Sequence, residues 1–320
     1  FVKEKTHATV AVGGIHVTFT ARETLECCES IDIVVRGEGE QTLLEICDRL
    51  EQGKSLGTAE GITYRGNRGQ IIENPPHPFI ADLDSLPFPA RHLLAIDKYP
   101  IRIAAAVGLE KYKVTNIISS RGCPLKCGFC STTLMWGSRI RFRSAENVVE
   151  EMEEVLQGYG FLEGFTFSDD NFTVSKERVH AICGLLKKKG LDIVWDCYAH
   201  VNTIDESLAR GMASAGCKLI TFGVESGSER MLEIMGKKTD LSKVKRAVGI
   251  CRRNGILPKC NFMFGYPGET EKDRRDTFRF IQENLWPNEV TLFDHVYIYP
   301  ATRVFQELLE SGYFGDDFSW

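Results

Sequence analysis

The chain of 320 residues is long enough for one large domain or two domains of ordinary size. Its 43% of hydrophobic and 26% of charged residues are typical of a globular protein. The formal net charge of −5 gives no electrostatic reason to expect nucleic-acid binding. No stretch holds the roughly 18 consecutive apolar residues of a membrane span. We therefore expect a protein without a nucleic-acid partner and without a transmembrane segment.

Eleven cysteines, an odd number, are spread along the chain. Most lie in apolar segments, where they are typical of small core residues and not of a disulfide framework. No secretory signal peptide opens the sequence, so the pattern predicts a cytoplasmic protein. The sequence starts at Phe1 without a methionine and ends abruptly at Trp320, so we expect a piece of a longer protein.

Strand and helix patterns alternate in residues 1–73. Short apolar runs are typical of strands, and between them apolar residues recur at helical spacing. We predict a tight turn at residues 13–16. We also predict strands at 9–12 and 31–36, helices at 21–28 and 41–52, and a hairpin of strands 61–65 and 70–73. This alternation predicts an open α/β sheet.

The next stretch, residues 74–112, has proline clusters at 75–78 and 87–89. Proline removes a hydrogen-bond donor and breaks regular elements. The sequence therefore predicts a linker here, between one domain at 1–73 and another at 113–320.

From residue 113 onward, strands alternate regularly with helices. We predict strands at 115–119, 164–168, 193–198, 219–224, 259–264 and 289–299. We predict helices at 144–156, with Ser144 as N-cap, and at 176–189, 205–215, 228–235, 241–254, 270–284 and 302–310. Six βα units of this kind predict a parallel sheet, whose chemistry gathers at the C-terminal ends of the strands.

A dense cysteine motif follows the first of these six strands. Cys123, Cys127 and Cys130 stand at C-x₃-C-x₂-C spacing, with glycine and proline forming a short loop around them. Three thiolates are one short of the four that close a structural zinc or iron–sulfur site. An iron–sulfur cluster held by three thiolates keeps one iron open to another ligand. A zinc knuckle with its fourth ligand elsewhere, or three unrelated thiols, is the alternative.

This motif in its strand–loop–helix context resembles the radical S-adenosylmethionine (SAM) superfamily. The resemblance covers about residues 113–310 and implies a partial (β/α)₆ TIM-like barrel. It implies a 4Fe–4S cluster whose metal ligands are Cys123, Cys127 and Cys130, with SAM chelating the fourth iron. One electron then cleaves SAM to a 5′-deoxyadenosyl radical. The cofactors carry this chemistry, and the protein supplies binding, orientation and exclusion of water.

The resemblance also assigns polar residues at strand ends to SAM. Asp169 or Asp170, after the second strand, would bind the SAM amine, because a carboxylate suits an ammonium group. A helix cap or turn is the alternative for both aspartates. Glu225 and Ser226 match a Gly-x-Glu-Ser segment that lies near the SAM ribose and methionyl group, and a solvated helix-capping carboxylate is the alternative for Glu225.

Three further residues belong to this comparison. Gly265, in a glycine-rich turn, would let the backbone approach the adenosine, and Phe129 would pack near the adenine. His200 ends the third strand where many members of the superfamily carry arginine. Histidine lacks the fixed fork and permanent charge of arginine, so we interpret His200 as structural.

The N-terminal region carries a second resemblance. Gly14 and His16 in a Gly-Gly-x-His turn, with Gly37 and Glu38 after the second strand, resemble the later half of a flavodoxin-like (Rossmann-type) cobalamin-binding domain. The Asp-x-His-x-x-Gly motif whose histidine is the lower cobalt ligand in that domain is missing from this sequence. His16 matches the turn and not that motif, and a loop histidine bonded to backbone is its alternative.

Together, the resemblances imply a cobalamin-dependent radical SAM enzyme, with methylation of an unactivated carbon in a small-molecule substrate as the expected outcome. A flavodoxin or ferredoxin would supply the electron. An oxidoreductase, cyclase or methylthiotransferase that does not use methylcobalamin is the second hypothesis. An iron–sulfur or zinc binding module without enzymatic activity is the third.

Overall fold

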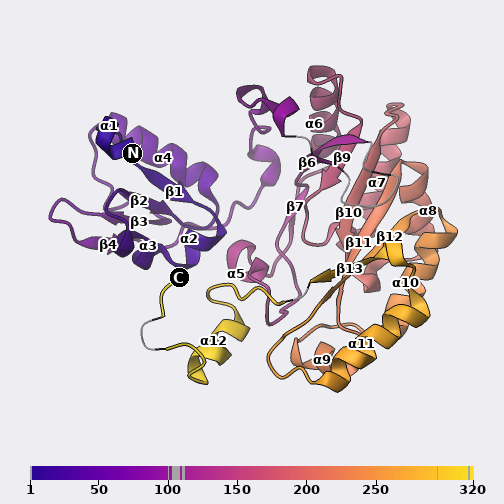
Figure 1. Cartoon of the computed structure of the whole chain (residues 1–320). Coiled ribbons are helices and arrows are strands. Elements are labelled where there is room, and N and C mark those ends of the chain that lie inside the picture. The colour runs from indigo at the N-terminus through magenta and orange to yellow at the C-terminus, as the bar shows by residue number, and fades with distance from the viewer. Residues whose placement is uncertain (1, 100, 103–108, 110–111, 294, 316–317) are drawn as a thin grey trace. The chain divides into compact units, whose positions relative to one another are not determined.

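The computed structural model describes residues 2–99, 101–102, 109, 112–293, 295–315 and 318–320. The chain divides into two compact units (Figure 1). The small unit comprises residues 1–81, 129–138 and 298–320, and the barrel unit comprises 82–128 and 139–297. Positions 100, 103–108, 110 and 111 of the predicted linker lie outside the described residues.

The small unit contains a four-stranded sheet in the order β1-β2-β3-β4. Its strands are β1 (Ala11–Gly13), β2 (Ile33–Val35), β3 (Ile62–Arg65) and β4 (Ile71–Glu73). β1 and β2 are parallel, and β3 and β4 form the predicted antiparallel hairpin. The helices are α1 (Val2–Lys5), α2 (Ile15–Phe19), α3 (Ala21–Cys27), α4 (Gly39–Glu51), α5 (Thr132–Trp136) and α12 (Arg303–Glu310).

One prediction for this unit was wrong. The turn predicted at residues 13–16 is confined to Gly14, whose φ of 114° suits glycine, and helix α2 begins at Ile15. The Thr18 hydroxyl donates to the Gly14 carbonyl at 2.8 Å and closes the first helical turn. His16 therefore lies in a helix and not in a turn.

The barrel unit is built on a seven-stranded sheet in the order β13-β12-β11-β10-β9-β6-β5. Its six parallel strands are β6 (Lys113–Ile117), β9 (Gly164–Phe167), β10 (Val194–Ala199), β11 (Cys217–Glu225), β12 (Leu257–Met263) and β13 (Val290–Phe293). The short edge strand β5 (Ile101–Arg102) is antiparallel to β6. The six predicted βα units and the partial barrel are confirmed, although the last strand is shorter than the predicted 289–299.

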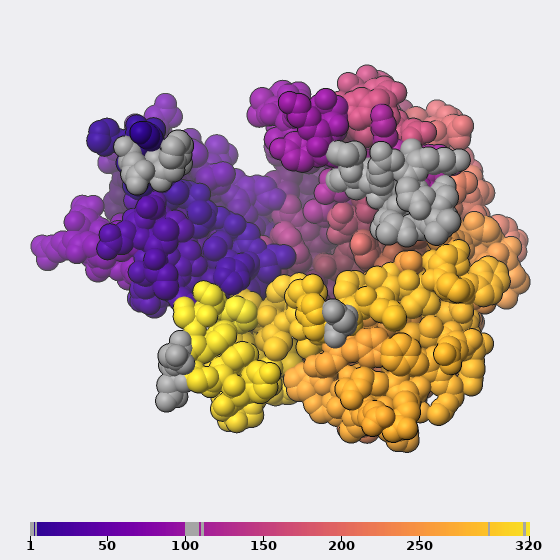
Figure 2. Space-filling view, in the orientation of Figure 1, coloured from indigo at the N-terminus to yellow at the C-terminus, as the bar shows by residue number. Residues whose placement is uncertain are grey.

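Helices cover the outer side of this sheet. They are α6 (Ala145–Gly158), α7 (Lys176–Lys188), α8 (Glu206–Ser214), α9 (Glu229–Ile234), α10 (Leu241–Arg253) and α11 (Glu271–Asn284). Each begins at a side chain that accepts a hydrogen bond from the first turn, as Ser144 does from the backbone NH of Asn147 at 3.1 Å. Helices α9, α10 and α11 form the orange surface in Figure 2. None of the described helices has the length and apolar content needed to cross a bilayer.

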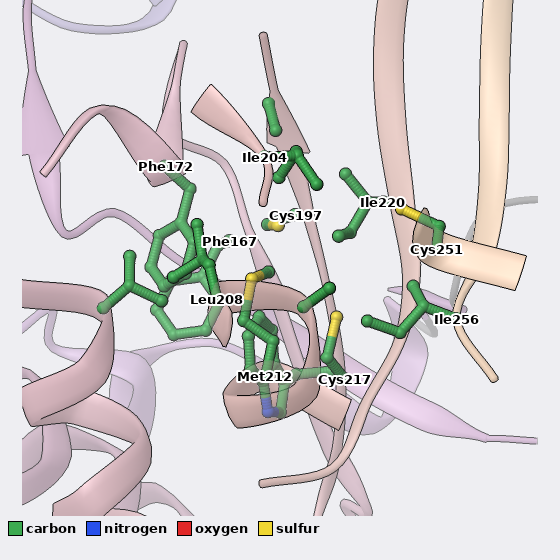
Figure 3. Packing of buried hydrophobic residues seen from close by; sticks show 14 of the residues in the cluster. Phe167, Phe172, Cys197, Ile204, Leu208, Met212, Cys217, Ile220, Cys251 and Ile256 are labelled. Atoms are coloured by element: carbon green, nitrogen blue, oxygen red, sulfur yellow. The ribbon is translucent and has the colours of Figure 1, made fainter. Parts of the chain in front are cut away.

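The main hydrophobic core lies between the sheet and these helices. Figure 3 shows the Phe167 and Phe172 rings next to one another, tilted by 34° with centroids 4.3 Å apart, in the cluster that also holds Cys197, Leu208 and Ile220. Most cysteines outside the motif are buried here or next to it: Cys183, Cys197, Cys217, Cys251 and Cys260. A smaller layer at the N-terminal ends of the strands contains Val114, Val194, Leu219 and partly buried Leu257. Because side chains alternate along a strand, this layer lies on the opposite face of the sheet from the main core.

Gly164 at the start of β9 offers a test of this packing. A Cβ atom there would lie 1.7 Å from the Val194 carbonyl oxygen of β10, so the strands could not keep their spacing. We predict that Gly164→Ala lowers the free energy of unfolding by about 2–4 kcal/mol. Gly184→Ala in helix α7 is the control, because nothing lies within 4 Å of its added Cβ. Urea unfolding of both variants checks this, and an unchanged midpoint for Gly164→Ala would contradict it.

Candidate active site

The cysteine loop begins at a fixed point between β6 and β9. These strands pair in parallel register, with Ile117 beside Phe167, so the chain leaves both at the same end of the sheet. The carboxylate of Asp169 accepts hydrogen bonds from the Ser119 backbone NH at 2.7 Å and the Ser119 hydroxyl at 2.6 Å. The Ser120 hydroxyl donates a third at 2.5 Å. Asp169 thus fastens the first residues of the loop to the end of β9.

Arg178 of helix α7 completes this buried network. Its Nη2 donates to the Ser119 hydroxyl at 2.9 Å and lies 3.5 Å from Oδ2 of Asp169. Burial lowers the pKa of Arg178, and the negative charge of Asp169 opposes this effect. Because the Asp169 oxygens are engaged by protein donors, the structure gives Asp169 a bracing role. Its predicted contact with the SAM amine stays a prediction, as does that of the exposed Asp170.

The three cysteines follow this brace within one loop. Cys123 is buried, and Cys127 and Cys130 are half-buried. Gly122 has a φ of 100°, and the Gly128 NH donates to the Met235 carbonyl at 2.8 Å. In the part of the chain that the structure describes, no three His, Cys, Asp or Glu side chains converge closely enough to hold a metal ion. The donor set itself, three soft thiols within eight residues, fits an iron–sulfur cluster.

Glu225 ends strand β11 in a strained conformation. Its φ of 73° is uncommon for any residue other than glycine, and the pairing with β12 shifts register between Gly223 and Glu225. The Lys237 ammonium donates to Oε1 of Glu225 at 3.0 Å, and both side chains are at most 10% exposed. A Cβ on Gly223 would lie 2.3 Å from that oxygen. The strand end therefore holds a buried ion pair at the predicted SAM residue.

Ser226 and Gly265 are placed differently from each other. The Ser226 side chain is buried and lies 3.1 Å from the Thr277 hydroxyl, and it accepts from the Ser228 NH at 3.1 Å. Its hydroxyl therefore fixes the loop against helix α11. Gly265 is exposed, with a φ of 78°, and its NH donates to Glu269 at 2.8 Å. Both assignments to SAM stay predictions.

His200 follows β10, and its backbone continues the extended conformation of that strand. The Asn202 NH donates to Nδ1 at 3.3 Å, so the proton of the neutral ring is on Nε2. Nε2 is buried and has no hydrogen-bond partner among the described residues. Burial, followed by the charges of Lys237 and Lys243, lowers the pKa of His200 to about 4. His200 is therefore neutral, with an Nε2–H donor that has no partner among the described residues, and its interpretation as structural stays a prediction.

Two charged residues of this site were missed from the sequence. Arg178 lies nine positions after Asp169, and Lys237 lies 12 after Glu225. Neither belongs to a recognisable motif, and a lysine or arginine on a helix or turn is usually solvated. Phe129, the predicted adenine neighbour, is half-buried in residues 129–138, which belong to the small unit.

The glycine loops of the small unit form a separate candidate binding region. Gly14 follows β1 and Gly37 follows β2, and nothing lies within 4 Å of a Cβ added at either residue. The Thr18 hydroxyl joins the loops, since it donates to the Gly14 carbonyl and accepts from the Gly37 NH at 3.1 Å. His16 is exposed and meets Trp320 edge-on, with ring centroids 5.9 Å apart.

Glu38 has a different environment from these glycines. It is 5% exposed, and its Oε2 accepts from the Ile80 NH at 2.6 Å. The carboxylate therefore fastens the proline-rich segment within the small unit. Its predicted contact with cobalamin stays a prediction.

Comparison with known proteins identifies the family. A profile of the Radical SAM superfamily matches residues 117–281, more than half of the chain. The chain belongs to the radical SAM superfamily. This radical SAM protein is 37% identical over 297 residues to an uncharacterised methyltransferase of Pyrococcus horikoshii, covering 93% of this chain and 62% of that protein.

Two further similarities agree with this assignment. An anaerobic magnesium-protoporphyrin IX monomethyl ester cyclase of Rubrivivax gelatinosus is 29% identical over 305 residues, covering 93% of this chain and 52% of the cyclase. The solved structure of the radical S-adenosylmethionine methyltransferase TsrM from Kitasatospora setae, with cobalamin and a [4Fe-4S] cluster bound, superposes with a TM-score of 0.76 at 21% identity. That alignment covers 97% of this chain and 59% of TsrM, and it shows a shared fold. The chain thus spans 52–62% of these relatives' lengths.

Adjacent aspartates allow a matched test of the brace. Asp169→Asn leaves Arg178 without its counter-charge and replaces an acceptor oxygen by a donor, so we predict a loss of about 2–4 kcal/mol in the free energy of unfolding. We also expect faster amide hydrogen exchange at residues 119–130. Exposed Asp170→Asn is the control and should change both quantities much less than Asp169→Asn does. Equal effects of the two substitutions would contradict the bracing role.

Proposed function

We propose that this radical SAM protein is the core of a cobalamin-dependent methyltransferase that acts on an unactivated carbon of a small molecule. The observation that carries the proposal is the cysteine loop, which Asp169 and Arg178 fasten to the C-terminal ends of the barrel strands. The Pyrococcus relative named as a methyltransferase supports methyl transfer, as does the fold shared with TsrM, which binds cobalamin.

Cys123, Cys127 and Cys130 would hold the 4Fe–4S cluster. When bound, the cluster supplies the electron that cleaves SAM reductively. The rest of the chain fixes the position of the loop that carries these cysteines. The Ser119–Asp169 bonds set the entry of the loop, and the Gly128–Met235 bond holds its middle.

Strand-end residues would bind and orient SAM. Glu225 and Lys237 place one negative and one positive group in a buried position, and His200 offers a donor at Nε2. These groups match the ammonium and carboxylate of the methionyl part of SAM. Gly265 would expose backbone to the adenosine, and Phe129 would pack near the adenine.

Cobalamin would approach the small unit at Gly14 and Gly37. Both glycines expose backbone with no side chain in the way, and Thr18 holds their loops together. Exposed His16 stands beside them. Their position at the C-terminal ends of two parallel strands is the usual ligand-binding edge of an open α/β sheet.

The similarity to the Rubrivivax cyclase favours a second candidate function, oxidative ring closure by the same radical chemistry. Identity of 37% with the methyltransferase against 29% with the cyclase places methylation first.

We propose a functional division into a partial cobalamin-binding domain at 1–73, a linker at 74–112 and a radical SAM barrel at 113–320. The protein would work in the cytoplasm, where cysteine thiols stay reduced. A one-electron donor such as flavodoxin or ferredoxin would be its partner.

Anaerobic turnover tests the radical chemistry. After reconstitution with iron and sulfide and reduction, the protein should convert SAM to 5′-deoxyadenosine, measured by liquid chromatography and mass spectrometry. Cys127→Ser should lower the product to the level of cluster-free protein, because one ligand is lost. Cys47→Ser, which changes an exposed cysteine of helix α4, is the control and should keep the wild-type rate. No product from fully loaded wild-type protein would favour a mere cluster-binding module.

Two matched glycines test cobalamin binding. Gly37→Ala places a methyl group where the cofactor would meet the backbone, and we predict at least a several-fold weaker affinity for hydroxocobalamin in an absorbance titration. Gly53→Ala, after helix α4, is the control, because both glycines have positive φ values (73° and 64°) and open space around an added Cβ. Both variants therefore carry similar backbone strain, of about 1 kcal/mol. Equal affinity in the two variants would argue against the glycine loops as the site.

A further inference from the structure

Strand β10 carries polar side chains that the proposed SAM chemistry does not use. Trp195 and Cys197 are buried in the core between sheet and helices, and Figure 3 shows Cys197 among those residues. Side chains alternate along a strand, so Asp196 and Tyr198 lie on the opposite, inner face of the barrel. The parallel register places Thr166 of β9 beside Asp196 on this face.

Asp196 is a buried carboxylate with little to offset its charge. It is 3% exposed, and among the described residues its carboxylate accepts one hydrogen bond, from the Thr166 hydroxyl at 3.0 Å. Burial raises the pKa of Asp196 to about 6, although the Thr166 bond acts in the opposite direction. At neutral pH the carboxylate is therefore mainly ionised.

No basic side chain in the described part of the chain pairs with Asp196. Lys259 of β12 lies in register with Thr221 on the inner face, but its ammonium donates to the Asn288 carbonyl at 3.2 Å. A buried charge without a counter-charge costs free energy, and such groups concentrate at functional sites. The missing partner of Asp196 is therefore a candidate ligand group.

The two sides of Asp196 along the strand differ in polarity and exposure. Toward the start of the strands, Val114, Val194 and Leu219 form an apolar layer. Toward their end, Tyr198 is 42% exposed. Burial and the charge of Asp196 raise the pKa of Tyr198, so its phenol stays protonated. A ligand that enters from the C-terminal ends of the strands would thus contact the Tyr198 ring first and the Asp196 carboxylate next.

We propose that Asp196, assisted by Tyr198, binds a positively charged nitrogen of the substrate, such as a protonated amine, inside the barrel. The role of this molecule as substrate rests on the proposed function. A cation suits the position because a charge-assisted hydrogen bond is stronger than a neutral one and offsets the buried charge. The Tyr198 ring, two residues along the same face of the strand, would add a cation–π contact. A substrate carboxylate would be repelled here.

Three probes of similar size test the proposal: propylammonium, propan-1-ol and propionate. The protein carries ¹³C-labelled aspartate, and Asp196→Asn assigns the carboxyl resonance of Asp196. We expect propylammonium to shift this resonance and to bind at least about tenfold more tightly than propan-1-ol, with no response to propionate. Asp192→Asn, which changes an exposed aspartate just before β10, is the matched control and should leave the response unchanged.

Tyr198→Phe keeps the ring and removes the hydroxyl, and it should weaken propylammonium binding less than Asp196→Asn does. Equal responses to propylammonium and propan-1-ol, or no response to any probe, would overturn the proposal. The probes bind without SAM, so the result is independent of turnover. Selective propylammonium binding in a protein that forms no 5′-deoxyadenosine would keep the cation site and refute the radical function. Turnover without selective propylammonium binding would refute the cation site and keep the radical function.

Discussion

The buried carboxylate of Asp169 is the constraint on which the candidate active site depends. It receives three hydrogen bonds from Ser119 and Ser120, two residues that stand 50 and 49 positions earlier in the chain. A loop with three cysteines would otherwise leave β6 with considerable conformational freedom, and ordering each residue costs about 1–2 kcal/mol. Because Arg178 offsets the charge, the brace can be buried without leaving an unpaired ion. The proposed cluster chemistry at the strand ends thus depends on a buried network of hydrogen bonds and one ion pair.

The cysteines packed against the sheet differ in environment from those of the motif. Iron binds thiolates, and a buried thiol resists ionisation. Burial raises the pKa of Cys183 and of Cys260 to about 12 and also raises that of Cys197. These thiols stay protonated in the core. The motif cysteines lie instead in a loop, where Cys127 and Cys130 are half-buried and Cys123 is buried. Location in a loop, and not the number of cysteines, distinguishes the proposed cluster ligands from the core thiols.

Local patterns made much of this fold predictable. Alternating apolar runs and N-cap residues such as Ser144 depend on neighbours in sequence, and the cysteine spacing is itself a local signal. Pairings between distant residues were not predictable. The bonds of Asp169 to Ser119 and Ser120 could not be predicted because these residues lie in another βα unit, and Glu38 likewise bonds to Ile80, 42 positions away. Asp196 was overlooked because one aspartate in a buried strand has no motif, and its lack of a counter-charge exists only in three dimensions.

The end of β11 shows how backbone strain and electrostatics act together. Gly223 leaves space for the Glu225 carboxylate, and the left-handed backbone of Glu225 turns that carboxylate toward Lys237. With Lys237 nearby and little water, a second cation is unfavourable, so His200 stays neutral and keeps its proton on Nε2. One buried ion pair and one neutral donor therefore share this end of the barrel. A zwitterionic group can pair with both Glu225 and Lys237, so that no net charge stays buried. A simple anion or cation can pair with only one of them and would leave a net buried charge. The strained backbone of Glu225 therefore costs free energy, and this strain allows a negative and a positive side chain to lie together at one strand end.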